Sequence, residues 1–180
     1  VPADGAVTVR TLTITADGRE SGIHRATLRN RRYQPAQPEP ANARESGVAY
    51  RYYEGTFDRF AEMEATAPVR SGSAKSFDWR GYGRHEHFGL RFEGWLHVPE
   101  DGLYRFRAQA DDASALYIDD EAIVRNETYD QPVEGSAPLR AGWHRLRLDF
   151  YQRSGDIGLG LSWAKGDAPL QPLDATQLRH

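Results

Sequence analysis

The sequence contains no cysteine, which excludes disulfide bonds, thiolate metal sites and cysteine nucleophiles. It has no apolar run long enough to cross a bilayer, so we expect no membrane insertion. A formal charge of −3 gives no reason to expect DNA or another nucleic acid as a partner. The first residue is not Met and no signal-peptide pattern is present, so we expect a piece of a longer polypeptide whose export signal lies upstream.

The length and composition predict one ordinary folded domain with room for an attached fragment. Hydrophobic residues make up 39% of the 180 positions and charged residues 27%, which is enough apolar material for a packed core. The sequence has no Gly-x-Ser-x-Gly elbow, no phosphate-binding loop and no His-Glu-x-x-His motif. We therefore expect that the chain itself is not an enzyme.

Apolar residues alternate with polar ones along several segments. The pattern is clearest in Phe88–Val98 and returns in 104–110, 146–150 and 159–163, with Gly, Pro and Asp turns between them. Many short strands of this kind predict an all-β, antiparallel β-sandwich or barrel. The one short stretch that favours a helix is Phe57–Glu64.

The N-terminal part has a different character. Residues 1–33 predict a β-hairpin with strands Ala6–Thr15 and Gly22–Asn30, and the proline-rich residues 34–46 predict a linker. The sandwich would then occupy residues 47–180. Because an isolated hairpin is marginal in water, it must pack on the sandwich or belong to a neighbouring domain.

Five separated motifs resemble a known family. The first two are Gly94–Phe106, which reads Gly-Trp-Leu-His-Val-Pro-Glu-Asp-Gly-Leu-Tyr-Arg-Phe, and Ala110–Asp119, which contains Asp-Asp and Leu-Tyr-Ile-Asp. The others, in order, are Ile123–Asn126, Leu139–His144 with Phe150–Tyr151, and Leu161–Trp163. Over residues 47–180 the chain resembles the protective-antigen (PA-fourteen) domain, a β-sandwich.

This resemblance implies a carbohydrate-binding accessory module with a glycan as partner. Residues 1–33 are similar to the last strands of the chitobiase/β-hexosaminidase C-terminal domain, through Val7–Thr11 and Asp17–Ser21. Together the two resemblances imply a secreted, periplasmic or cell-surface glycoside hydrolase of the β-N-acetylhexosaminidase type, whose catalytic domain would be a further partner. The alternative is a structural spacer or dimerisation module with no ligand of its own.

The adjacent pair Asp111 and Asp112 is the sharpest local feature. Neighbouring side chains on a regular strand point to opposite faces, so two such carboxylates converge on one ion only where the backbone is distorted. In the fungal adhesins of the resembled family a cis peptide does this, and a loop Asn completes a Ca²⁺ site. Gln152 stands at about that position here, followed by Arg153, whose charge would oppose a cation. The alternative is that the Asp pair satisfies a turn beside the core.

Six residues are expected to bind carbohydrate. They are Asp111, Asp112, Asn126, Gln152, Asp156 and Trp143, with Asp111, Asp112 and Gln152 as ligands of calcium. Trp95, like Trp143, lies on the polar face of its strand and is a second candidate for stacking on a sugar, whereas Trp163 is expected in the core.

Two other polar clusters favour simpler interpretations. The acidic run Asp119–Glu121 predicts a solvated hairpin tip rather than a pair of glycosidase carboxylates. His85 and His87 would share one strand face near His97, but zinc would need a further ligand and supporting hydrogen bonds, so a polar strand face is the expectation.

Overall fold

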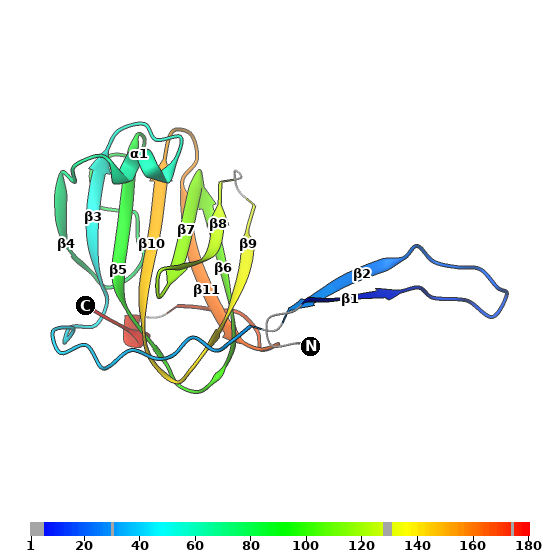
Figure 1. Cartoon of the computed structure of the whole chain (residues 1–180). Helices are drawn as coiled ribbons and strands as arrows, with labels where there is room; N and C mark the ends of the chain where they lie inside the picture. Colours follow the sequence, from blue (N-terminus) through cyan, green and yellow to red (C-terminus); the bar gives the residue numbers. More distant parts are fainter. Residues whose placement is uncertain (1–5, 30, 128–130, 174) are drawn as a thin grey trace. The chain divides into compact units, whose positions relative to one another are not determined.

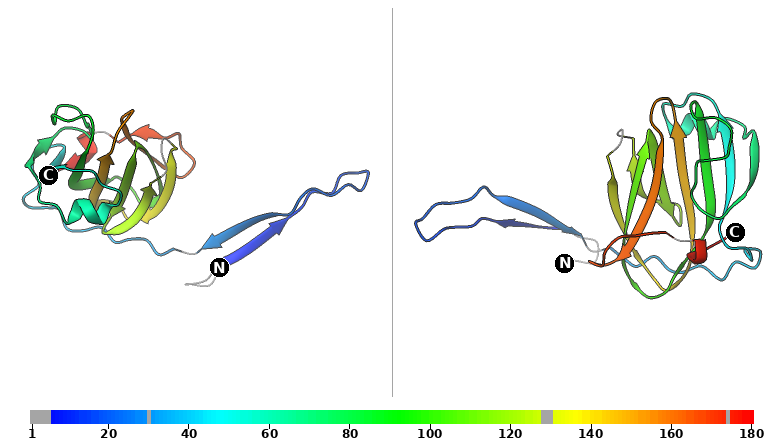
Figure 2. Two further views of the ribbon diagram at one scale, coloured as in Figure 1. Left: turned by 90° about the horizontal axis from the view of Figure 1, so that it is seen from above. Right: turned by 180° about the vertical axis from the view of Figure 1, so that it is seen from behind.

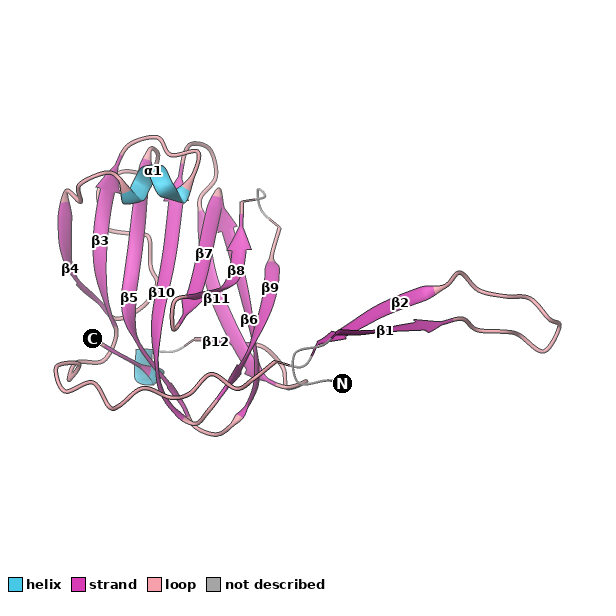
Figure 3. Cartoon of the chain, in the orientation of Figure 1, coloured by secondary structure: helices cyan, strands magenta, loops and turns pink. Residues whose placement is uncertain are grey.

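The computed structural model describes residues 6–29, 31–127, 131–173 and 175–180, and within them the regular secondary structure is almost entirely antiparallel β-strand (Figures 1 and 3). The chain divides into two compact units, Val1–Tyr33 and Gln34–His180, each described here by itself. Among the described residues, no helix has the length and apolar character needed to cross a bilayer.

The first unit is a β-hairpin. Strands β1 (Ala6–Thr11) and β2 (His24–Arg29) pair antiparallel, with Thr11 opposite His24. Gly18 has a φ of 81° in the connecting turn, a conformation that glycine adopts without steric cost. The strands are shorter than predicted, because the long connection between them forms only one further bridge, from Ile14 to Glu20. Asn30, the predicted end of the second strand, lies outside the described residues.

The second unit is a sandwich of two antiparallel sheets, which confirms the predicted fold class (Figure 2). The larger sheet has the order β4-β3-β5-β10-β7-β8, with β13 also paired to β5. Its strands are β3 (Val48–Glu54), β4 (Arg70–Ala74), β5 (Phe88–Val98), β7 (Ala113–Ile118), β8 (Glu121–Asn126), β10 (Gly142–Gln152) and β13 (Leu178–Arg179).

The smaller sheet has the order β12-β11-β6-β9. Its strands are β6 (Gly102–Asp111), β9 (Val133–Leu139), β11 (Gly158–Lys165) and β12 (Gln171–Pro172). Two short helical segments complete the fold, α1 (Phe60–Glu64) and a 3₁₀ turn at Ala175–Gln177. The helix begins three residues later than predicted, because Glu62 accepts hydrogen bonds from the backbone N–H groups of Asp58 and Arg59 and so fixes the start of the helix at Phe60.

The core fills the space between the two sheets. Alternate residues of each strand point inward, as the period of two predicts, and their aromatic members include Phe92, Phe106 and Phe150, all fully buried. Trp163 is also buried, stacked on Tyr104 at 5.2 Å between ring centroids. The opposite positions face outward, and these positions carry the polar chemistry of the larger sheet.

Two segments border the outward face of the larger sheet. At one end, α1 packs Phe60 and Met63 against Tyr151, and Glu64 bonds the buried Arg91 at 2.6 Å (Figure 1). At the other end run residues 34–46, which were predicted to be a linker. This segment lies against the sandwich, because its non-proline residues keep a backbone N–H that can form hydrogen bonds with the strands. The backbone N–H of Gln37 donates to the Trp143 carbonyl at 2.7 Å.

The turn between β7 and β8 exposes Asp120 and Glu121, as predicted for a solvated hairpin tip, whereas Asp119 is fastened to β10. Asp119 accepts the Arg145 N–H at 2.8 Å and lies 2.6 Å from Nδ1 of His144. The second ring nitrogen of His144 lies 2.9 Å from the Arg140 carbonyl oxygen. Burial opposes the charged imidazole most strongly, but these acceptors together raise the pKa of His144 above 6.5.

This pairing makes the stability of the sandwich depend on pH. A folded-state pKa above the unfolded value means that protonated His144 stabilises the fold fully below pH 6.5, and the contribution is lost as the pH rises through the folded-state pKa. We expect Asp119→Asn to remove this fall in the free energy of unfolding, measured by urea titration on both sides of pH 6.5. The matched control is Asp120→Asn, whose carboxylate is exposed. A free energy of unfolding that decreases with pH as steeply in Asp119→Asn as in the parent chain would contradict the assignment.

Candidate functional site

Except for Trp143, the predicted site residues gather at the end of the sandwich where β6 passes into β7. Strand register brings them together: Gly158 of β11 lies opposite Asp111, Tyr151 of β10 lies opposite Ala113, and Asn126 of β8 lies opposite Ser114. Asp111, Asp112, Asn126 and Gln152 are all buried. We call this region the loop end.

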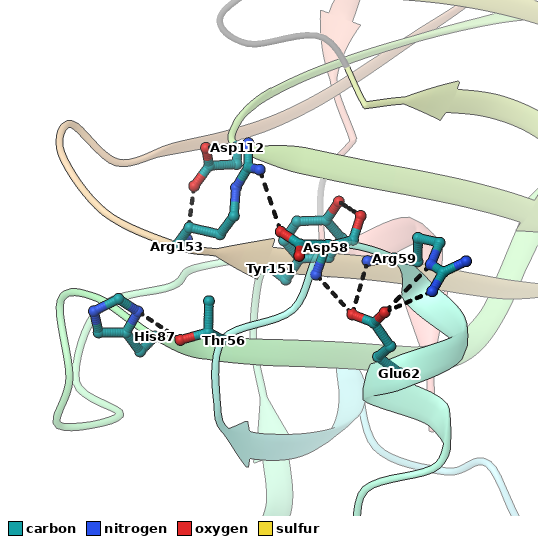
Figure 4. Close-up of polar contacts among 8 residues, drawn as sticks. All are labelled: Thr56, Asp58, Arg59, Glu62, His87, Asp112, Tyr151 and Arg153. Atoms are coloured by element: carbon teal, nitrogen blue, oxygen red, sulfur yellow. Dashed lines mark hydrogen bonds and ion pairs between the residues drawn. The ribbon is translucent and has the colours of Figure 1, made fainter.

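The peptide bond between Asp111 and Asp112 is cis. Both carboxylate oxygens of Asp112 are occupied by one residue, as Figure 4 shows. Oδ2 accepts the backbone N–H of Arg153 at 2.6 Å, and Oδ1 accepts its guanidinium at 3.1 Å. The hydrogen bond to Asp112 raises the pKa of Arg153, so the guanidinium stays charged. An internal cation therefore already neutralises one member of the Asp pair.

Further contacts fix the loop that carries Arg153. The backbone N–H of His87 donates to the Arg153 carbonyl at 2.9 Å, and Glu86 accepts the N–H of Gly155 at 3.1 Å. His87 therefore belongs to a loop ahead of β5, with a φ of 56°, rather than to a polar strand face. Gln152 donates its amide to the backbone carbonyl of Asp156 at 2.7 Å, and this bond is the contact that brings Asp156 to the loop end.

A second carboxylate approaches Arg153 from the loop ahead of α1. Asp58 lies 3.5 Å from the guanidinium, and its backbone carbonyl accepts the Tyr151 hydroxyl at 2.9 Å (Figure 4). Hydrogen bonds from the backbone of Asp58 and the side chain of Arg59 lower the pKa of Glu62, so this cap remains ionised. The Arg153 side chain is thus held between a buried carboxylate and an exposed one.

Oxygen atoms suited to a hard cation are present beside this pair. Gln152 Oε1 and Ser114 Oγ are buried and have no hydrogen-bond partner within the described part of the chain. Sequence reasoning passed over Ser114, although a polar residue facing inward among Leu116 and Ile118 was the available signal. Described His, Asp and Glu residues form no group of three, so a cation would need such amide or hydroxyl oxygens. The donors fit Ca²⁺ in part, since Asp112 is shared with Arg153.

A shallow groove of about 220 Å³ opens next to Asp111. Its floor includes Gly158 and Gly160, at which an added Cβ would meet no atom within 4 Å. Backbone is therefore exposed to a ligand beside a buried carboxylate. The groove lies where a molecule could contact both Asp111 and the glycine backbone at the start of β11.

Trp143 does not reach the loop end. It stands near the start of β10, whereas Gln152 ends the same strand. Nine residues of strand separate them, or about 30 Å. The alternation placed Trp143 on the outward face of its strand, as observed. Alternation assigns faces only, and the distance along the strand from Trp143 to Gln152 was the signal that it does not use.

Comparison with known proteins places the fold. The family profile described as PA14 domain, the protective-antigen type, matches residues 44–175. The solved PA14 domain of the MpAFP antifreeze protein is 17% identical with a TM-score of 0.64, covering 80% of this chain and 96% of that one. The Epithelial Adhesin 9 A domain from Candida glabrata, solved with Galβ1-3GlcNAc, is 12% identical with a TM-score of 0.63, covering 82% and 95%.

Similar domains also occur within longer proteins. An anti-sigma factor domain-containing protein is 17% identical with a TM-score of 0.62, over 74% of this chain, which spans only 48% of that one. No curated protein matches the sequence. Since all these identities are low, the structural likeness establishes the fold.

Asp112 and Arg153 give a direct test of how the loop end is held. We expect Asp112→Asn to lower the free energy of unfolding by about 1–3 kcal/mol in chelator, because the Arg153 guanidinium and the loop N–H lose a buried, charged acceptor. Asp58→Asn, at the exposed partner of Arg153, should change it by less than about 0.5 kcal/mol. Urea denaturation measures both, and equal effects would contradict the assignment.

Proposed function

Because the chain belongs to the PA14 domain family, we propose that it is a non-catalytic carbohydrate-binding module whose loop end contacts glycans. The observation that carries the proposal is the groove beside Asp111, where a glycine floor adjoins a buried carboxylate. Two structural neighbours support it: an RTX adhesin domain described as sugar-binding, and the adhesin solved with Galβ1-3GlcNAc.

We infer that Ca²⁺ takes part at the loop end. Asp111, Asp112 and Gln152 would hold it, since carboxylate and amide oxygens are the ligands that this ion prefers. A bound Ca²⁺ supplies open coordination positions for sugar hydroxyls. For this to happen the Arg153 guanidinium must leave Asp112, so the ion and the guanidinium compete for one carboxylate.

The parent protein is proposed to be a secreted, periplasmic or cell-surface glycoside hydrolase of the β-N-acetylhexosaminidase type. A β-glucosidase from Kluyveromyces marxianus, solved with glucose, contains a similar domain with a TM-score of 0.54 that corresponds to 17% of its chain. Weak glycan binding by the module would raise the effective concentration of substrate at a linked catalytic domain. That catalytic domain is the proposed partner within the same polypeptide.

One observation favours the alternative of a spacer or dimerisation module. The hairpin of the first unit exposes aliphatic side chains that would gain from burial, namely Val7, Val9, Leu12, Ile14 and Ile23. A partner surface that covers them would explain their presence without any sugar.

A glycan array separates these functions. We expect a set of glycans that the chain binds in Ca²⁺ and no longer binds in chelator or in Asp111→Asn. The control Glu100→Gln, at an exposed residue near the opposite end of β6, should bind like the parent chain. Silence under both conditions would favour the spacer, and binding indifferent to chelator would move the site away from the Asp pair.

Competition between Arg153 and calcium predicts a gain of affinity. Removing the guanidinium in Arg153→Gln frees Asp112, and we expect the Kd for Ca²⁺, measured by isothermal titration calorimetry, to fall about tenfold or more. Arg145→Gln, at an arginine that pairs with Asp120 away from the loop end, is the matched control. Weaker calcium binding in Arg153→Gln would show that the arginine supports the ion instead.

A further inference from the structure

A second hollow surface lies on the outward face of the larger sheet, away from the loop end. Two adjoining cavities, of about 320 and 380 Å³, share Trp95 and His180 as lining residues. The first lies over β5, β10 and the end of β7, and the second continues beneath Pro40–Ala43. We call the two together the trough. Its volume is in the range of ordinary ligand sites.

Strand register sets the floor of the trough. Trp95 on β5 lies opposite Arg145 on β10, and in the next outward row Glu93 lies opposite Arg147. Arg147 in turn lies opposite Tyr117 on β7, with its guanidinium 4.0 Å from the ring centroid. The half-buried Trp95 indole is therefore surrounded by planar side chains that donate and accept hydrogen bonds.

The charges of the trough are balanced. Arg145 pairs with Asp120, Glu93 pairs with Arg51 at 3.2 Å, and Arg147 lies 3.5 Å from the buried Asp149. A balanced set of ion pairs does not favour an anionic or a cationic ligand. It does offer pairs of donors and acceptors of the kind that neighbouring hydroxyl groups need.

A protein partner is disfavoured by the distribution of apolar side chains. Among the described residues, the large exposed hydrophobic side chains all lie outside the trough. The centre of a protein interface is usually apolar and poor in charge, whereas the apolar lining of the trough, which includes Trp95, Tyr117 and Leu146, is interspersed with ion pairs. An aromatic face with polar neighbours suits the C–H face of a pyranose.

We propose that the trough is a second carbohydrate-binding site, which takes a neutral oligosaccharide and does not require calcium. Trp95 stacks on one sugar ring, and Arg145 and Glu93 hydrogen-bond its hydroxyl groups. The site lies on different residues from the loop end, so either site can fail while the other stands.

Trp143 provides the matched control. It stands on the same face of the neighbouring strand and is also half-buried, but it lines neither cavity. Its ring is covered by the Arg179 guanidinium at 4.9 Å and packs against His97 at 4.8 Å between ring centroids. A sugar cannot stack on that face without displacing the arginine.

The test uses the four tryptophans of the full chain, whose indole N–H signals are followed by ¹H–¹⁵N NMR and assigned with Trp95→Phe. The probes are triacetylchitotriose, cellotriose and Galβ1-3GlcNAc, with 3′-sialyllactose as the anionic comparison, all in chelator. We expect at least one neutral probe to shift the Trp95 signal. Trp95→Ala should weaken its binding about tenfold or more, and Trp143→Ala should leave it within about twofold.

Arg145→Gln and Asp112→Asn complete the design. Arg145→Gln should weaken the same probe about three- to tenfold, and Asp112→Asn should have no effect on it, because that change alters only the loop end. If Trp95→Ala fails to fold by circular dichroism, the comparison rests on Trp95→Phe and Arg145→Gln. A Trp95 signal that no neutral probe moves, a preference for 3′-sialyllactose, or a loss of binding in Asp112→Asn would each overturn the proposal.

Discussion

The apolar layer between the two sheets is the constraint on which the rest of the sandwich depends. Each strand must give its inward positions to side chains such as Phe92 and Phe106, because burial of apolar surface is the main favourable term in folding. With a period of two, this requirement fixes strand register, since a slip of one residue would turn the apolar side outward. The outward positions are then free for polar chemistry, and their neighbours across the sheet are already determined.

At the loop end the same alternation meets residues that are not apolar. Ser114, Asn126 and Gln152 occupy inward positions but carry hydroxyl or amide groups, and all three are fully buried. A buried polar atom without a partner costs about 1–3 kcal/mol, which a well-packed core avoids. Asn126 donates to the Gln131 carbonyl, whereas Ser114 Oγ and Gln152 Oε1 have no partner within the described part of the chain. Both of these atoms lie on strands next to the carboxylate pair, where a ligand or ion can satisfy them. The unfavourable free energy of these buried atoms therefore points to the same end of the sandwich as the Asp pair.

The sequence was informative wherever local chemistry decides the outcome. Alternation predicted the four central strands β5, β6, β10 and β11, and Gly18 the hairpin turn. The site at Asp111 and Asp112 stays a prediction. The sequence could not show that Arg153 reaches Asp112, since that depends on how the β10–β11 loop closes on His87. Nor could it show that residues 34–46 return to Trp143, because that contact follows from the packing of segments distant in sequence.

The loop end and the trough differ in how their charge is held, and this difference bears on how a glycan would be bound. At the loop end a single guanidinium holds Asp112, so an external cation can displace it. In the trough each carboxylate has its own arginine, and no added ion is needed. Trp95 and Phe88 are seven residues apart on β5, or about 24 Å, so the two sites lie farther apart than a short oligosaccharide reaches. A polymeric glycan could contact both sites at once. Binding at one site would then raise the effective concentration of glycan at the other, and the overall affinity would exceed that of either site alone.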